Sequence, residues 1–463
     1  MKVRRVGYVL AGFLSLTICM SAQTFTTLHS FDLTDGDEPV GALVQAINGN
    51  LYGTTDAGAG NCAGTVFEIT TGGVLTTLRC FDGTDGSAPR AALIQGTNGN
   101  FYGTTYGGGA NDSGTVFEIA SSGTLTTLYN FCSQRNSQGV CADGSAPHAG
   151  LVQGANGNFY GTTLGGGTTG NGTVFKITPS GALTTLHSFC ANGCTDGEEP
   201  TSGLVQATNG DLYGTTSAGG ANDYGTVFKI TPSGALTTLH SFEGTDGANP
   251  LAGLVQGTNG NFYGTTTGGG ASNYGKVFKI TPSGALTILH SFDGADGVNP
   301  DAGLVQGTNG NFYGTTYGGG TNNFGTVFEI TPSGTLTTLH SFDGTDGDHL
   351  DAGLVQDTNG NFYGTTSGGG ANGYGTVFSL SVGLGPFVET QATSGKVGAA
   401  VNILGTNLTG ATSVTFNGTQ AVFKVASSSE ITTKVPAGAT TGEIKVVTPS
   451  GTLSSNQVFR VIP

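Results

Sequence analysis

Apolar residues occur in short clusters separated by Asn, Gly and Pro, and the same clusters return along most of the chain. One unit reads G-L-V-Q, T-N-G-N, F-Y-G-T-T, a glycine-rich loop, V-F-K-I, T-P-S-G and A-L-T-T-L-H-S-F. Asn-Gly between two apolar runs favours a hairpin, and Pro-Ser-Gly favours a tight turn. Each unit therefore predicts four short antiparallel strands, A to D.

Seven copies of this unit are present. The pentapeptide [LF]-Y-G-T-T begins at Leu51, Phe101, Phe159, Leu212, Phe262, Phe312 and Phe362. The usual spacing, 50 residues, is the size of a propeller blade, and four-stranded blades are the units of that fold. The pattern predicts an all-β protein with a seven-bladed β-propeller over residues 23–382.

The ends of the repeat region indicate how the ring closes. Residues 24–31 form a lone D strand, and the seventh unit stops after its C strand at 376–380. The N-terminal strand would therefore complete the last blade and hide its open edge. A β-solenoid is the alternative fold, and it would need separate caps.

A different pattern follows a Gly-rich linker at 383–386. Short alternating strands with Gly and Asn turns fill residues 386–463 and predict a small immunoglobulin-like β-sandwich.

These motifs resemble two known families. The repeat F-Y-G-T-T-x-G-G-G-x-x-x-x-G-T-V-F-K-I is similar to the Gloeo/Verruco tandem repeat of exported bacterial proteins. The segment G-x-x-V-x-I-x-G-x-N-L with V-x-F-N-G resembles the IPT/TIG domain. The first resemblance implies a secreted or cell-surface protein and brings no catalytic residues. The second implies a spacer or adhesive module.

The N-terminus has the pattern of an export signal. Lys2, Arg4 and Arg5 precede an apolar run, and Ser21-Ala22 offers a cleavage point, so residues 1–22 are expected to be a signal peptide. Cys19 raises a lipoprotein as the alternative, but Ile18 precedes it where a small residue is expected. No sorting motif or hydrophobic tail precedes Pro463, so we expect a secreted or cell-surface protein without a stable membrane span.

Net charge narrows the choice of partner. The formal charge of the whole chain is −15, and the signal segment carries three of the 15 basic residues and no acidic one. Such an acidic chain lacks the basic surface that nucleic acid requires. A carbohydrate or surface polymer fits better, and we expect the protein to be a monomer.

The longer B–C and D–A loops share one face, and both length insertions fall in D–A loops of that face. Insertions on one side of a repeat array commonly mark its binding surface. Each insertion is bracketed by cysteines, and a third pair flanks the first C–D hairpin. In an exported chain these spacings predict the disulfides Cys62–Cys80, Cys132–Cys141 and Cys190–Cys194. Free buried thiols are the alternative.

The D–A loops also carry paired carboxylates, as in D-G-T-D-G. The best candidates for a metal are Asp82, Asp85, Asp293, Asp296, Asp343 and Asp346. Carboxylate oxygens suit Ca²⁺, the one cofactor these loops suggest, but Asp-Gly also builds turns, and we favour that structural interpretation. The histidines that recur on the D strands would lie too far apart to share a metal.

Aromatic side chains on the same face are the candidate ligand-binding residues, because a ring beside Gly and Asn suits stacking on a sugar. They are Tyr106, Tyr224, Tyr274, Tyr317 and Tyr374. The alternative is packing between blades. No nucleophile elbow, phosphate loop or zinc spacing is present.

The sequence thus favours a non-enzymatic binding or adhesion propeller with an Ig-like spacer. An extracellular polysaccharide lyase or hydrolase that uses the loop carboxylates is one alternative. A structural envelope protein is the other.

Overall fold

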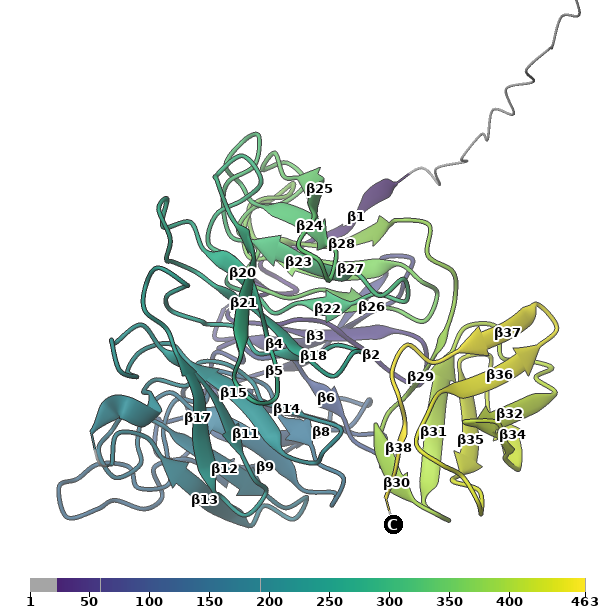
Figure 1. Cartoon of the computed structure of the whole chain (residues 1–463), viewed down its shortest axis with the longest axis horizontal. Helices are drawn as coiled ribbons and strands as arrows, with labels where there is room; N and C mark the ends of the chain where they lie inside the picture. The colour runs from purple at the N-terminus through teal and green to yellow at the C-terminus, as the bar shows by residue number, and fades with distance from the viewer. Residues whose placement is uncertain (1–22, 59, 192, 463) are drawn as a thin grey trace, which may run out of the picture.

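The computed structural model describes residues 23–58, 60–191 and 193–462. The predicted signal peptide lies outside these residues. Seven four-stranded antiparallel sheets surround a common centre, and a β-sandwich follows them (Figure 1). This confirms the predicted all-β, seven-bladed propeller. Within the described ranges no helix is long and apolar enough to cross a membrane.

Four classes of strand build the blades, which we number 1 to 7 in chain order. The A strands are β2 (Val44–Gln45), β6 (Ile94–Gln95), β10 (Val152–Gln153), β14 (Val205–Gln206), β18 (Val255–Gln256), β22 (Val305–Gln306) and β26 (Val355–Gln356). The B strands are β3 (Leu51–Thr55), β7 (Phe101–Thr105), β11 (Phe159–Thr163), β15 (Leu212–Thr216), β19 (Phe262–Thr266), β23 (Phe312–Thr316) and β27 (Phe362–Thr366).

The C strands are β4 (Thr65–Ile69), β8 (Thr115–Ile119), β12 (Thr173–Ile177), β16 (Thr226–Ile230), β20 (Lys276–Ile280), β24 (Thr326–Ile330) and β28 (Thr376–Ser381). The D strands are β5 (Leu75–Cys80), β9 (Leu125–Asn130), β13 (Leu183–Ser188), β17 (Leu236–Ser241), β21 (Leu286–Ser291), β25 (Leu336–Ser341) and β1 (Thr24–Ser30). A 3₁₀ turn, η1 (Cys194–Asp196), lies in the second insertion.

The first strand of the chain closes the ring, as the sequence predicts. Strand β1 pairs antiparallel with β28, from Thr24 opposite Ser381 to Ser30 opposite Thr376. In Figure 1 the purple β1 lies beside the green β28. Phe31, fully buried, then packs with Phe67 of blade 1 and Tyr363 of blade 7. The pairing hides both free edges, which stabilises the ring against opening.

Each hydrophobic core lies between two neighbouring blades. The B strands carry the main contact, because the tyrosine of one blade stacks on the phenylalanine of the next in five of the seven interfaces. Tyr263 and Phe312, for example, have ring centroids 3.9 Å apart. Aromatic pairs of this kind add about 1 kcal/mol beyond the area they bury. The repeat therefore encodes the packing of blade on blade.

Buried threonine hydroxyls complete this contact nearer the centre. In every blade the first threonine of the G-T-T sequence donates to a backbone carbonyl of the next blade, as Thr315 Oγ1 does to Ala352 O at 3.1 Å. The series ends with Thr365 of blade 7, whose hydroxyl donates to Gly41 O of blade 1 at 3.4 Å. Sequence repetition thus becomes a closed circle of hydrogen bonds.

The C-terminal domain is a sandwich of two four-stranded sheets. Its strands are β29 (Val388–Thr390), β30 (Ser394–Lys396), β31 (Ala400–Gly405), β32 (Ser413–Phe416), β33 (Thr419–Gln420), β34 (Phe423–Val425), β35 (Glu430–Lys434), β36 (Ile444–Thr448), β37 (Gly451–Ser454) and β38 (Arg460–Ile462). The sheets have the orders β29-β31-β35-β34 and β33-β32-β36-β37, with a separate β30-β38 pair. Ile403, Ile431 and Val446 are fully buried in its core.

The sandwich packs on the A–B turns of the propeller. Ser429 Oγ donates to Ile47 O at 2.7 Å, and Gln391 Nε2 donates to Gln95 Oε1 at 2.8 Å. A cleft of about 460 Å³ also lies between the turns of blades 4 to 6 and the sandwich. The domain therefore covers the turn end of the propeller, and the opposite end, which carries the long loops, is left uncovered.

Candidate functional site

The uncovered end is lined by two positions of every repeat, which we call the mouth ring. The first position lies four residues before each A strand. It directly follows a proline in blades 1 to 6 and Leu350 in blade 7. It holds Val40, Arg90, His148, Thr201, Leu251, Asp301 and Asp351. The other follows each B strand and holds Asp56, Tyr106, Leu164, Ser217, Thr267, Tyr317 and Ser367. The side chains of the first set are all partly buried.

The central position of the mouth ring follows from the backbone beside it. Two residues after the first ring position stands a glycine in blades 3 to 7. A Cβ on Gly253 would lie 3.0 Å from Gly203 O, and one on Gly353 would lie 3.1 Å from Gly303 O. These short separations show that neighbouring blades approach closely around the axis at this position, where blades 1 and 2 carry Ala42 and Ala92.

In blades 1 to 3 the mouth ring is linked by polar and aromatic contacts. Arg90 Nε donates to Asp56 Oδ1 at 2.9 Å, across the boundary between blades. The Arg90 guanidinium also lies 4.5 Å from the centre of the Tyr106 ring. Tyr106 in turn meets His148 edge to face at 6.1 Å. Burial and the nearby Arg90 charge lower the pKa of His148, which favours a neutral imidazole.

In blades 6 and 7 the ring is acidic. Burial and, to a smaller extent, the neighbouring Asp351 charge raise the pKa of Asp301 to about 7. The Oδ1 atom of Asp301 is buried and has no hydrogen-bond partner among the described residues. Burial also raises the pKa of Asp351. Tyr317 and His349 stack beside them, with ring centroids 4.4 Å apart.

The two sectors influence each other across the opening. His148, in blade 3, lies within electrostatic range of Asp351, in blade 7, and a protonated His148 would lower the pKa of that carboxyl, although burial outweighs this effect. Asp37 and Glu38 add further acidic groups whose pKa is raised, first by burial. Arg90 is the one arginine or lysine in the mouth ring, and Asp56 already neutralises it. The site is therefore acidic, partly shielded from solvent and bordered by two tyrosines.

The acidic loops predicted as metal candidates lie further out. The second carboxylate of each binds the adjacent D strand, where His290 Nε2 meets Asp296 Oδ2 at 2.6 Å and His340 Nε2 meets Asp346 Oδ2 at 2.7 Å. In blade 1 Asp85 pairs with Arg79. The recurring D-strand histidines are thus held within their own blades.

The first carboxylate of each acidic loop shapes its turn. Asp343 Oδ1 accepts hydrogen bonds from the Thr345 hydroxyl at 2.7 Å and from the Thr345 backbone N–H at 2.9 Å. Asp82 makes the same bonds with Thr84, and Asp293 accepts from the Ala295 N–H at 3.0 Å. These bonds lower the pKa of all three carboxyls. The geometry is that of an Asx turn.

The five candidate tyrosines fall into two groups. Tyr106 and Tyr317 belong to the mouth ring. Tyr224 and Tyr274 are 42% and 41% exposed and cover the glycines of the acidic loops, Gly244 and Gly294. Tyr374 occupies the equivalent loop position in blade 7 and packs with the core between blades 7 and 1.

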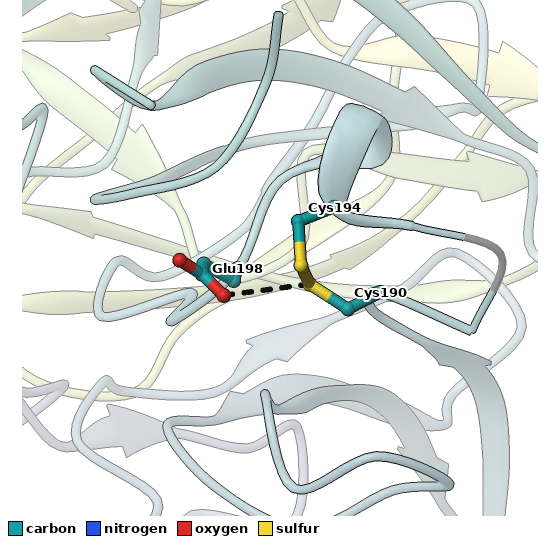
Figure 2. A group of neighbouring side chains, drawn as sticks. All are labelled: Cys190, Cys194 and Glu198. Carbon is teal, nitrogen blue, oxygen red and sulfur yellow. Dashed lines mark hydrogen bonds between the residues drawn. A yellow bond between two sulfur atoms is a disulfide. The ribbon is translucent and has the colours of Figure 1, made fainter. Parts of the chain in front are cut away.

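The structure contains the three predicted disulfides, Cys62–Cys80, Cys132–Cys141 and Cys190–Cys194. Within the described ranges, the one meeting of three metal-ligand side chains is Cys190, Cys194 and Glu198 (Figure 2). Glu198 Oε2 lies 3.5 Å from Cys190 Sγ. Because the two sulfurs are bonded to each other, no thiolate is free to bind a metal there while the bond is intact.

Sequence reasoning missed most of the mouth ring, including Arg90, Asp301 and Asp351. A signal was available: the two ring positions differ from blade to blade, whereas the neighbouring G-T-T and G-L-V-Q segments hardly change. Aligning the seven units column by column would have exposed this contrast.

Fold and site together define a repeat-built β-propeller with a central ring of side chains that differs between blades. The chain belongs to the Gloeobacter/Verrucomicrobia repeat family, which it matches over residues 14–142, 135–308 and 284–409. Residues 387–461 match the IPT/TIG domain. No curated protein matches the sequence.

One of three similar solved structures supports the fold, and it supports nothing beyond the fold. Virginiamycin B lyase from Staphylococcus aureus is similar with a TM-score of 0.51 and 15% identity, over 78% of this chain and 99% of that one. A fungal alcohol oxidase of the AA5 family has a TM-score of 0.49 and 14% identity, over 95% and 99%. A gluconolactonase from Xanthomonas campestris has a TM-score of 0.40 and 11% identity, over 78% and 90%.

Proposed function

We propose that the protein is an exported, non-enzymatic binding propeller whose mouth ring holds a carbohydrate or surface polymer. The observation that carries this proposal is the contrast between a nearly uniform scaffold and a ring in which no two blades carry the same pair of residues. A scaffold needs only repetition, whereas a ligand with low symmetry needs different groups around it. The IPT/TIG domain, packed on the turn end, would present the loop end outward.

The chemistry of the ring fits a polyhydroxylated ligand. Tyr106 and Tyr317 offer aromatic faces on nearly opposite sides of the opening, and Asp301 and Asp351 offer acceptors for hydroxyl or amino groups. Binding sites commonly combine apolar faces with a few converging polar groups in this way. The surplus of carboxylates disfavours anionic polymers and favours neutral or amino-bearing sugars.

A glycan array followed by titration of the best ligand tests this proposal. Tyr317→Ala and Tyr106→Ala should each weaken binding about 3- to 10-fold, from the 0.5–1.5 kcal/mol that an aromatic contact contributes. Tyr224→Ala and Tyr274→Ala are the matched controls, because they remove the same side chain from the outer loops. Equal affinity in all four variants would refute the ring as the binding site.

A second function is favoured by one specific observation, the raised pKa of Asp301. A carboxyl with a pKa of about 7 beside a second carboxyl can serve as a general acid, so the ring could support polysaccharide hydrolysis or elimination. Incubation with polysaccharide panels should then yield reducing ends or unsaturated products. Asp301→Asn should lower the rate about 10²- to 10⁴-fold. If no panel member is cleaved, this second function is rejected.

A further inference from the structure

A carboxylate that no other blade has lies between the propeller and the C-terminal domain. Asp357 occupies the A–B turn of blade 7, at a position that holds Ala46, Gly96, Gly154, Ala207, Gly257 and Gly307 in the other blades. Its side chain is 1% exposed. Oδ1 accepts the Asn359 N–H at 2.7 Å, but Oδ2 is buried without a partner. Because the other six blades form the same turn with Ala or Gly, the fold of a blade does not require a carboxylate there.

The C-terminal domain brings a second carboxylate to the same turn. The Phe387 N–H donates to Thr358 O at 3.0 Å, which fixes the start of the domain beside blade 7. Two residues later Glu389, on β29, lies within electrostatic range of Asp357. Burial raises the pKa of Asp357 to about 6, and burial together with the smaller effect of the Asp357 charge raises the pKa of Glu389 to about 7.

Within the described part of the chain, no basic side chain is found to interact with this pair. The other groups that interact with it are the Asn359 backbone and the Tyr363 phenol. No hydrogen bond joins the two carboxyls, since Asp357 Oδ2 has no partner. The carbonyls of Leu384 and Gly385 lie against Gly360 in the same turn. The surroundings are rich in oxygen, and the buried Asp357 carboxylate is costly without a counter-charge, whereas Glu389 is only partly buried.

We propose that Asp357 and Glu389 bind an oxygen-preferring divalent cation that joins the last blade to the C-terminal domain. Two carboxylates supply up to four oxygens, and Ca²⁺ and Mg²⁺ bind carboxylates, carbonyls and water. The cation neutralises both groups and holds the domain over the turn end of the propeller. This site is distinct from the mouth ring, and it does not depend on what the ring binds.

Calorimetric titration of the mature protein with Ca²⁺, and separately with Mg²⁺, tests the proposal at pH 7.5. One site is expected for at least one of the ions. Asp357→Gly introduces the residue that four other blades carry, so the turn should still fold, and Glu389→Gln keeps the shape of the second side chain. Each should weaken binding at least tenfold. Asp343→Asn, in an outer acidic loop, should leave binding unchanged.

A second readout separates this site from general effects on folding. Bound cation should raise the melting temperature of the wild type by about 2–4 °C and that of Asp357→Gly by much less. Absence of binding by the wild type, or equal binding by Asp357→Gly, overturns the proposal. If neither ion binds and the stability gap between wild type and Asp357→Gly instead varies between pH 5 and 8, the pair shares a proton and the cation site is rejected.

Discussion

The mouth ring holds a carboxyl whose ionisation should destabilise the native protein. Asp301 has a pKa of about 7 in the native state, against an ordinary value of 3.8. As the pH rises from about 4 to 7, the unfolded chain ionises this group while the native protein resists. The native state therefore loses stability through that range. Asp301→Asn removes the ionisation and retains the size of the side chain.

The magnitude follows from the pKa difference. A difference of about three in pKa corresponds to at most roughly 4 kcal/mol of unfolding free energy at pH values well above 7. At pH 5 the cost is under about 2 kcal/mol, because the native carboxyl is still neutral and the unfolded one is only about one pH unit beyond its pKa. The gain from Asp301→Asn should therefore increase with pH.

Urea denaturation of wild type and Asp301→Asn at pH 5 and pH 8.5 measures this difference. The variant should be the more stable protein at pH 8.5, and its advantage should shrink at pH 5. Asp343→Asn is the control of opposite sign, because the hydrogen bonds from Thr345 lower the pKa of that carboxyl. Asp343 contributes stability at neutral pH that is lost as the pH falls. An Asp301→Asn variant no more stable than wild type at pH 8.5 would refute the reasoning.

Three further changes test the scaffold. Replacing Cys132 and Cys141 by Ser should cost about 3 kcal/mol from loop-closure entropy, visible as a lower urea midpoint that reduction of the wild type reproduces in part. Phe31→Ala, at the end of the closing strand, should cost about 3–5 kcal/mol because Phe31 is fully buried, whereas Val74→Ala, 67% exposed, should change the unfolding free energy by less than about 0.5 kcal/mol. Thr315→Val removes one hydrogen bond between blades and should cost about 1–3 kcal/mol, since the Ala352 carbonyl loses its donor; an unchanged midpoint would contradict a role for these hydroxyls in closure.

The packing of the C-terminal domain affects which end of the propeller is open to ligands. The bonds from Ser429 to Ile47 and from Gln391 to Gln95 place the domain on the A–B turns, opposite the mouth ring. The family resemblance implied a spacer, which would need few contacts with its neighbour. The interface instead places the domain against one end of the propeller, where a cleft of about 460 Å³ remains, and the loop end is left free for ligands.

The sequence alone determined the repeated elements of this protein. Strand positions, blade number, the immunoglobulin-like domain and the three disulfides follow from local patterns, because hairpins, turns and cysteine loops are short-range features. Closure by residues 24–31 pairs strands more than 340 residues apart, and it was predicted because the repeat count leaves one D strand at the start and one gap at the end. The pairing of D-strand histidines with loop aspartates is also local, since His340 and Asp346 lie only six residues apart. Comparing repeats would have revealed that partnership.

Only the tertiary structure decided which side chains meet across blades. Asp301 and Asp351 are 50 residues apart, and Arg90 and Asp56 are 34 apart, yet curvature of the ring brings each pair to one opening. Asp357 and Glu389 come within electrostatic range of each other because a separate domain folds back onto the turns. Their pKa shifts depend on burial, which is a property of the assembled surface. A repeat pattern fixes each blade, whereas the mouth ring and the domain contact arise only when the blades close into a ring.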